Sequence, residues 1–109
     1  MTEKLIDVDG ALGRFGGNAT IFKMLLKKFA ASTYYNDLVE AIAAGDLVSA
    51  EHAAHTIKGT AGNLSLTPLF EIATLLDQQL KVQTDYIEPF EQLRVIYSET
   101  ITEIGTYTA

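Results

Sequence analysis

The sequence has no cysteine, only two prolines and little positive charge among its 109 residues. Without cysteine the chain can form no disulfide, thiolate nucleophile or cysteine-ligated metal site, and this fits a reducing cytoplasm. It also lacks an apolar run of the roughly 18 residues that a membrane span needs, and its N-terminus has no signal-peptide pattern. We therefore expect a cytoplasmic segment that makes no contact with a membrane.

The scarcity of positive charge limits the classes of partner. Eight Lys and Arg residues stand against fourteen Asp and Glu residues, for a formal net charge of −6. Lys58 is the only Lys or Arg between Phe29 and Leu80. Because nucleic-acid binding needs clustered positive charge, we expect no nucleic-acid partner. The acidity itself is explained as well by solubility as by a role in partner choice.

The chain also lacks internal repeats, low-complexity tracts and the alternating pattern of strands. With 109 residues, 48% of them hydrophobic, it can build one compact core but not two, so residues 1–109 are expected to form a single domain. Since short connections between long amphipathic helices favour antiparallel neighbours, the sequence predicts an all-α fold. We expect an antiparallel up-down-up-down four-helix bundle with a short extra N-terminal helix.

Capping and turn residues set the boundaries of the expected helices. The residues concerned are Asn18, Asp46 and Thr67 as N-caps, Gly45 as a left-handed stop, Pro68 at a first helical position, and Asp85 with Glu88 as a capping box. The predicted helices cover residues 8–14, 18–44 and 47–64, followed by one that Thr67 caps and one that Asp85 introduces.

The predicted helix 47–64 has two contrasting faces when it is wound at about 100° per residue. One face is an apolar stripe that comprises Ala50, Ala54, Ile57, Ala61 and Leu64. The opposite face carries an imidazole, an ammonium group and two residues without side chains, namely His55, Lys58, Gly59 and Gly62. Each interior glycine costs a helix about 1 kcal/mol relative to alanine. Two of them on one face indicate that another molecule approaches the backbone beside His55.

The string His-Thr-Ile-Lys-Gly-Thr-Ala-Gly-Asn-Leu, residues 55–64, resembles the signature of histidine-containing phosphotransfer (HPt) domains. The likeness extends over most of the chain, through Gly16-Gly17-Asn18, the turn at Gly45-Asp46 and the segment 73–77. One departure is Ser65, where the family commonly has glycine; Asn63 or Ser65 can serve this helix end at modest cost. The resemblance implies a helical bundle with the active histidine midway along one helix.

An exposed imidazole has a free ring nitrogen that can attack an acyl phosphate, and the resemblance implies that Nε2 of His55 is the phosphorylated atom. Lys58, three residues on, can offset the charge of the phosphoryl group. The alternative for Lys58 is a solvated lysine paired with Glu51 or Asp77. Asp77 in turn either orients the imidazole or is a solvated carboxylate on the rim.

His52, three residues before His55, suggests a metal site together with Glu51. A stable zinc site needs three or four ligands, but the chain has only these two histidines, and Lys58 would oppose a dication. We therefore expect no metal. Gly16-Gly17-Asn18 lacks the Gly-Lys-Ser/Thr of a phosphate-binding loop, so we expect no cofactor of the protein's own.

These features predict a monomeric phosphocarrier that has a nucleophile and a cation but no autokinase activity. In a bacterial-type phosphorelay, His55 would accept a phosphoryl group from the phospho-aspartate of one receiver domain and pass it to the aspartate of another. The receiver, in a response regulator or a hybrid histidine kinase, would supply Mg²⁺. It would dock on Gly59, Gly62, Glu51 and His52.

Two alternatives remain open from the sequence. The first is a non-catalytic helical adaptor bundle that binds a partner through Gly59 and Gly62. The second concerns context: Met1 lies within a few residues of the expected fold, as in a free-standing carrier, but the same segment could be the C-terminal domain of a hybrid sensor histidine kinase. Only in that second setting would the whole protein be a kinase.

Overall fold

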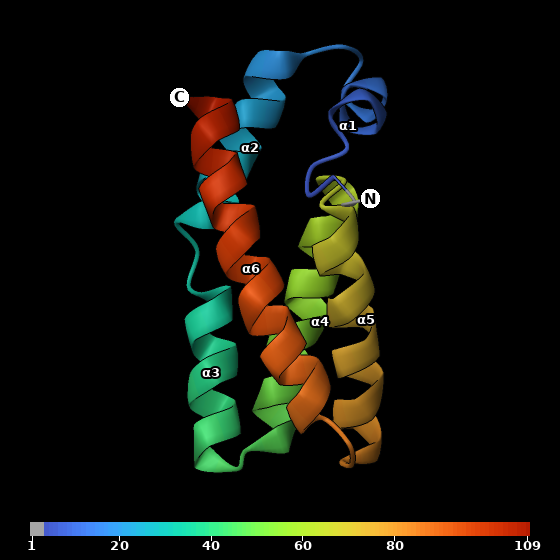
Figure 1. Cartoon of the computed structure of the whole chain (residues 1–109), viewed down its shortest axis with the longest axis vertical. Helices are drawn as coiled ribbons and strands as arrows, with labels where there is room; N and C mark the ends of the chain where they lie inside the picture. Colours follow the sequence, from blue (N-terminus) through green and yellow to red (C-terminus); the bar gives the residue numbers. More distant parts are fainter. Residues whose placement is uncertain (1–3) are drawn as a thin grey trace.

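The computed structural model describes residues 4–109, which fold into helices joined by short turns (Figure 1). Met1, which bears on the question of a free-standing protein, lies outside this range. Residues 4–109 contain no strand, so the predicted all-α class is confirmed, and none of their helices is long and apolar enough to cross a membrane. The helices are α1 (Val8–Arg14), α2 (Ala19–Ala30), α3 (Tyr34–Ala44), α4 (Leu47–Asn63), α5 (Thr67–Val82) and α6 (Ile87–Thr108).

The predicted helix 18–44 is broken in two, so the structure has one helix more than expected. α2 ends at Ala30 and α3 begins at Tyr34. At the break, the hydroxyl of Ser32 donates to the carbonyl oxygen of Phe29 at 2.7 Å, and the backbone N–H of Ser32 donates to the same oxygen at 3.0 Å. Serine side chains compete in this way with the helical bonding pattern. The prediction of one continuous helix was wrong.

The helix that carries His55 lies in the middle of the molecule. α4 packs between α3 and α5, while α5 and α2 pack against the long helix α6 (Figure 1). α1 lies across the end of the molecule where α4 leads into α5 (Figure 1). Because α3 and α5 cover two sides of α4, only a strip of its surface is left to face solvent.

The core-facing stripe of α4 is confirmed. Its members are all buried, with 0% exposure for Ala50, Ala54, Ile57 and Ala61 and 4% for Leu64. Three of the five are alanines, whose small side chains let the neighbouring helices approach the α4 backbone closely. The stripe therefore fixes the rotation of α4 about its axis, and with it the direction in which the opposite face points.

Three predicted helix ends are confirmed by their hydrogen bonds or backbone angles. Asn18 Oδ1 accepts from the N–H of Ile21 at 3.0 Å, and Asp46 Oδ1 accepts from the N–H of Ser49 at 3.1 Å. Gly45 has a φ of 71°, the left-handed conformation that ends α3. The turn that introduces α4 is therefore the one expected from Gly45 and Asp46.

Two predicted N-caps are wrong. Leu66 is the N-cap of α5 and makes no side-chain cap bond, so Thr67 is already helical, although Pro68 does lie in the first turn. α6 is capped by Tyr86, again without a side-chain bond. Asp85 has a φ of 54° and belongs to the turn that follows α5. Asp85 is therefore not the N-cap residue of α6, and it does not form the expected capping box with Glu88.

The C-terminal end of α4 is held by the N-terminal segment. Ser65 has a φ of 56°, and the N–H of Leu66 donates back to the carbonyl of Ala61 at 2.9 Å. The backbone N–H of Asp7 donates to the carbonyl of Ser65 at 2.9 Å, and the guanidinium of Arg14 donates to a carbonyl of the last turn of α4, that of Gly62. Ser65 thus serves the helix end without glycine, and α1 is fastened to it.

Candidate functional site

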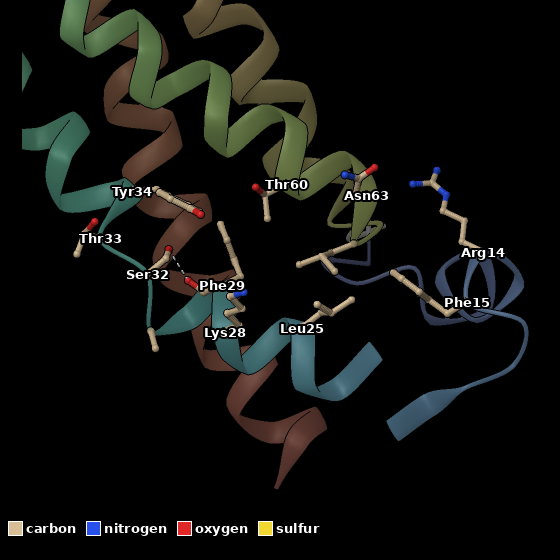
Figure 2. Close-up of a pocket in the computed structure, with 12 residues that line it drawn as sticks. Arg14, Phe15, Leu25, Lys28, Phe29, Ser32, Thr33, Tyr34, Thr60 and Asn63 are labelled. Atoms are coloured by element: carbon tan, nitrogen blue, oxygen red, sulfur yellow. Dashed lines mark hydrogen bonds between the residues drawn. The ribbon is translucent and has the colours of Figure 1, made fainter. Parts of the chain in front are cut away.

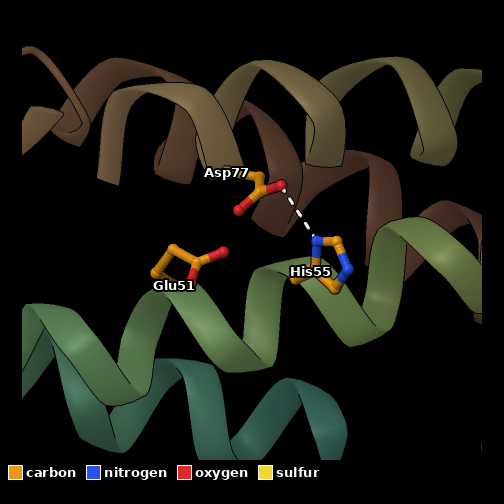
Figure 3. Close-up of side chains that lie close together, drawn as sticks. All are labelled: Glu51, His55 and Asp77. Atoms are coloured by element: carbon orange, nitrogen blue, oxygen red, sulfur yellow. Dashed lines mark hydrogen bonds and ion pairs between the residues drawn. The ribbon is translucent and has the colours of Figure 1, made fainter. Parts of the chain in front are cut away.

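His55 lies near the middle of α4, opposite the buried stripe, with its side chain 62% exposed. One edge of the ring faces α5: His55 Nδ1 is 3.2 Å from Oδ2 of Asp77. The other ring nitrogen points away from that carboxylate (Figure 3). If Nδ1 carries the proton that Asp77 accepts, the Nε2 lone pair is left on the solvent side of the ring.

Asp77, which comes from α5, is only 1% exposed. Burial alone raises the pKa of this carboxyl. The neighbouring Glu51 carboxyl group, the hydrogen bond with His55 and the positive charge of Lys81 lower the pKa by more than burial raises it, so the net shift is downward. Asp77 is therefore an ionised acceptor rather than a solvated rim carboxylate. Of the two alternatives considered from the sequence, the structure fits the one in which Asp77 contacts the imidazole of His55.

Two lysines share Oδ2 of Asp77 with the imidazole. Lys58 Nζ is 3.7 Å from this oxygen and Lys81 Nζ is 3.6 Å from it. Lys58 thus lies where it pairs with Asp77 while remaining one turn from His55. Lys81 was not singled out from the sequence. The signal that could have found it is the i, i+4 spacing from Asp77 on α5.

Glu51 lies one turn before His55 on α4 and is half-buried. Its carboxyl group points toward Asp77 (Figure 3). Contact with the Asp77 carboxyl group, burial and the negative charge of Asp77, in that order, raise the pKa of Glu51. The two carboxyl groups therefore differ: Asp77 holds its charge, and Glu51 takes up a proton more readily than an ordinary glutamate.

Glu51, His55 and Asp77 each offer one possible metal-ligand atom, and these atoms lie within 4.8 Å of one another. His52, the second histidine considered from the sequence, is not part of this group. The ammonium groups of Lys58 and Lys81 already neutralise Asp77, and two cations beside the cluster disfavour a further dication. The expectation of no metal stays a prediction.

The two glycines of the histidine face have different surroundings. A Cβ atom built on Gly59 would meet nothing within 4 Å. A Cβ atom on Gly62 would lie 3.1 and 3.2 Å from two ring carbons of Phe70 on α5. Gly62 therefore has an intramolecular reason to lack a side chain, because Phe70 packs against it. Gly59 has none among the described residues, so close approach of another molecule remains its best explanation.

Hollows flank the histidine face. His55 lies in an open depression that Glu51, His52, Thr56 and Lys81 also line. A larger pocket of about 860 Å³ lies farther along α4, between its last turns and α2 (Figure 2). Aromatic and aliphatic side chains line the larger pocket, with two cations at its edge: Phe15, Leu25, Phe29 and Tyr34, with Arg14 and Lys28. Since His55 does not line it, it is separate from the imidazole site.

A sequence model of the Hpt domain family matches residues 28–103, a range that contains α3, α4, α5 and the larger part of α6. The chain therefore belongs to the Hpt domain family. Family membership implies phosphotransfer in two-component signalling and interaction with receiver domains. Comparison with curated proteins and with solved structures gives no significant match. The family resemblance inferred from residues 55–64 and their flanks is confirmed.

Proposed function

We propose that this Hpt domain is a phosphorelay intermediate in which His55 accepts a phosphoryl group from one receiver domain and passes it to another. The observation that carries the proposal is the exposed His55 ring, held at Nδ1 by the buried carboxylate of Asp77 at 3.2 Å. The proposal treats residues 1–109 as one monomeric, cytoplasmic domain of a bacterial-type relay, with α3, α4, α5 and α6 in antiparallel order. It applies equally to a free-standing carrier and to the C-terminal domain of a hybrid sensor histidine kinase.

The transfer step follows from the two edges of the imidazole. The Nε2 lone pair attacks the phosphorus of the receiver's acyl phosphate, the P–O bond to the aspartate breaks, and the aspartate leaves as a carboxylate. The ring then carries phosphate on Nε2 and keeps its proton on Nδ1, where Asp77 accepts it. The positive charge that develops on the ring is stabilised by Asp77. The reverse step delivers the phosphoryl group to a second receiver.

The chain supplies positive charge for the phosphoryl group. Because its sequence has no phosphate-binding loop motif, the proposal includes no autokinase activity. Lys58 and Lys81 both lie within 4 Å of Asp77 Oδ2, and each can turn its ammonium group toward a phosphate on the neighbouring ring. The receiver provides Mg²⁺ at its own acidic site. Docking uses the open surface at Gly59, with Glu51, His52 and Gly62 around the imidazole.

The experiment that tests the proposal is incubation of the chain with a receiver domain that carries labelled phosphate. We expect the label on this chain to be acid-labile and base-stable, as phosphohistidine is. His55→Gln should keep the fold, because the side chain lies off the core, and should accept no label. Circular dichroism of the variant checks the first point.

The competing hypothesis is a non-catalytic adaptor that binds a partner through the Gly59 side of α4. It predicts receiver binding without any transfer of label in the wild-type chain. Label that persists in His55→Gln, or that maps to His52, would assign the reaction to another residue. Either result would overturn the site proposed above.

A further inference from the structure

Oδ1 of Asp77 is a buried polar atom for which the described residues provide no hydrogen-bond donor. Oδ2 faces His55, Lys58 and Lys81, whereas Oδ1 is buried and no N–H or hydroxyl of residues 4–109 donates to it. A buried carboxylate oxygen without a donor is unfavourable, because it has lost its hydrogen bonds to water and gained none in return. The group that faces Oδ1 is the carboxyl of Glu51 (Figure 3).

A carboxylate has only acceptors, but a protonated carboxyl group has one O–H donor. Glu51 can therefore satisfy Oδ1 of Asp77 in its protonated form and not in its ionised form. The charged and titratable groups that act on Glu51 are His52 on its own helix and Asp77 and Lys81 on α5. The ammonium groups of Lys58 and Lys81 favour the ionised form of Asp77. A proton held between the two carboxyl groups therefore resides on Glu51.

We propose that Glu51 is a positioning residue for His55: its protonated carboxyl group donates to Oδ1 of Asp77 and thereby holds Oδ2 against Nδ1 of the imidazole. This bond restrains the rotation of the Asp77 carboxylate, which is otherwise broad about its last torsion angle. A restrained Asp77 keeps the proton of His55 on Nδ1 and the lone pair on Nε2. The link is reversible, because ionisation of Glu51 removes the donor and puts two negative charges side by side.

The tautomer of His55 is the direct readout of this arrangement. Long-range ¹H–¹⁵N NMR of the full chain distinguishes a proton on Nδ1 from one on Nε2. In the wild-type chain, the fraction of neutral imidazole rings with the proton on Nδ1 should fall as rising pH ionises Glu51. In Glu51→Gln the amide N–H donates at every pH, so the fraction should stay high and lose that pH step.

The matched variants are Glu51→Ala, which has no donor, and Glu71→Ala, which removes an exposed glutamate from α5. Glu51→Ala should lower the Nδ1-protonated fraction at all pH values, whereas Glu71→Ala should behave as wild type. The kinetic part rests on the proposed function. Transfer from a phosphorylated receiver should slow by about tenfold in Glu51→Ala, the lower end of the losses found when an outer hydrogen bond that orients a metal-bound histidine is removed, and Glu51→Gln should restore it.

The outcomes separate this inference from the proposed function. An unchanged tautomer in Glu51→Ala, or a wild-type pH step that persists in Glu51→Gln, overturns the positioning role even if transfer occurs. A tautomer that responds as expected in a chain that accepts no phosphoryl group supports the positioning and removes the proposed function. If Glu51→Ala fails to fold, the test is the pH dependence of the His55 tautomer in the wild-type chain compared with that in Glu51→Gln.

Discussion

Lys58 and Lys81 hold their ammonium groups near the same oxygen of Asp77, but they are not equivalent residues. Lys58 shares α4 with His55 and is 30% exposed, whereas Lys81 lies on α5 and is 56% exposed. A more buried ammonium group is less screened by water and interacts more strongly with a nearby charge. Of the two, Lys58 should therefore contribute more to the stabilisation of a phosphoryl group on His55.

Lys58→Ala should slow phosphoryl transfer without unfolding the bundle, since Lys81 still neutralises Asp77. The expected loss is about 1–3 kcal/mol of transition-state stabilisation, equivalent to roughly 5- to 150-fold in rate. Rapid-quench measurement at subsaturating receiver tests this, with Lys81→Ala as the matched variant and a smaller expected loss. An unchanged rate in Lys58→Ala would show that Lys58 only pairs with Asp77 and does not assist phosphoryl transfer.

The two glycines of the histidine face give a second test at the scale of single residues. Gly59→Ala should raise the free energy of unfolding by about 1 kcal/mol on helix propensity, because nothing obstructs the new methyl group. Gly62→Ala should gain less, since its methyl group would press on the Phe70 ring at 3.1 Å. Thermal melting of both variants gives the comparison.

Receiver affinity, measured on the same two proteins, separates docking from packing. If a receiver approaches the backbone at Gly59, the stabilised Gly59→Ala protein should bind it more weakly and accept phosphoryl groups more slowly. Lower stability of Gly59→Ala with unchanged receiver binding would contradict the docking role of this surface.

Among the helices, α4 depends on a cap that titrates. Hydrogen bonds from the Ser49 hydroxyl and the Ser49 backbone N–H hold the pKa of Asp46 below its usual value of 3.8. A carboxyl group whose pKa is lower in the folded chain stabilises that chain above its unfolded pKa. The stabilisation is lost as the pH falls through the folded pKa.

Asp46→Ala should therefore lower the melting temperature by a few degrees at neutral pH, as loss of an N-cap typically does. The gap between the variant and the wild type should narrow under acid conditions below the folded pKa of Asp46. Glu99→Ala is a suitable comparison, because Glu99 is exposed within α6 and its side chain makes no hydrogen bond or ion pair with another described residue. A gap that stays constant with pH would exclude the cap as its cause.

The helices show which sequence signals were sufficient. Gly45, Asp46 and Asn18 act locally through backbone angle or a short side-chain bond, so their roles could be read from the sequence. The break at Ser32 could not, because the apolar spacing of the flanking segments continues through it and the serine could equally have faced solvent within a helix. The first residues of α5 and α6 depend on the conformation of the turns that precede them. That conformation is set by the packing of the folded chain and could not be read from capping residues alone.

At the scale of the whole molecule, the site divides in the same way. His55, Lys58 and Gly59 share one helix, and helical spacing alone placed them on one face. Asp77 could be named but not placed, because its distance to His55 depends on how α4 and α5 pack together. The Glu51–Asp77 pairing also depends on that packing, as does the position of the Lys81 ammonium group beside the same carboxylate. Neither was predicted.

The hydrogen bonds from Asp7 to Ser65 and from Arg14 to Gly62 make one end of α4 depend on a segment far away in the sequence. They cover the carbonyl groups of Gly62, in the last turn of the helix, and of Ser65, two residues beyond its end, which otherwise only water would satisfy. Local opening there should therefore be controlled by the N-terminal segment rather than by α4 itself.

Deletion of residues 1–17 should speed amide hydrogen exchange of residues 61–66, while amides near His55, two turns inside the helix, keep their protection. Exchange rates measured by NMR for the two lengths of chain give the comparison, and uniform acceleration along α4 would contradict it. His55 would then lie in a stable part of α4, and residues outside the matched Hpt segment would keep the C-terminal end of that helix from fraying.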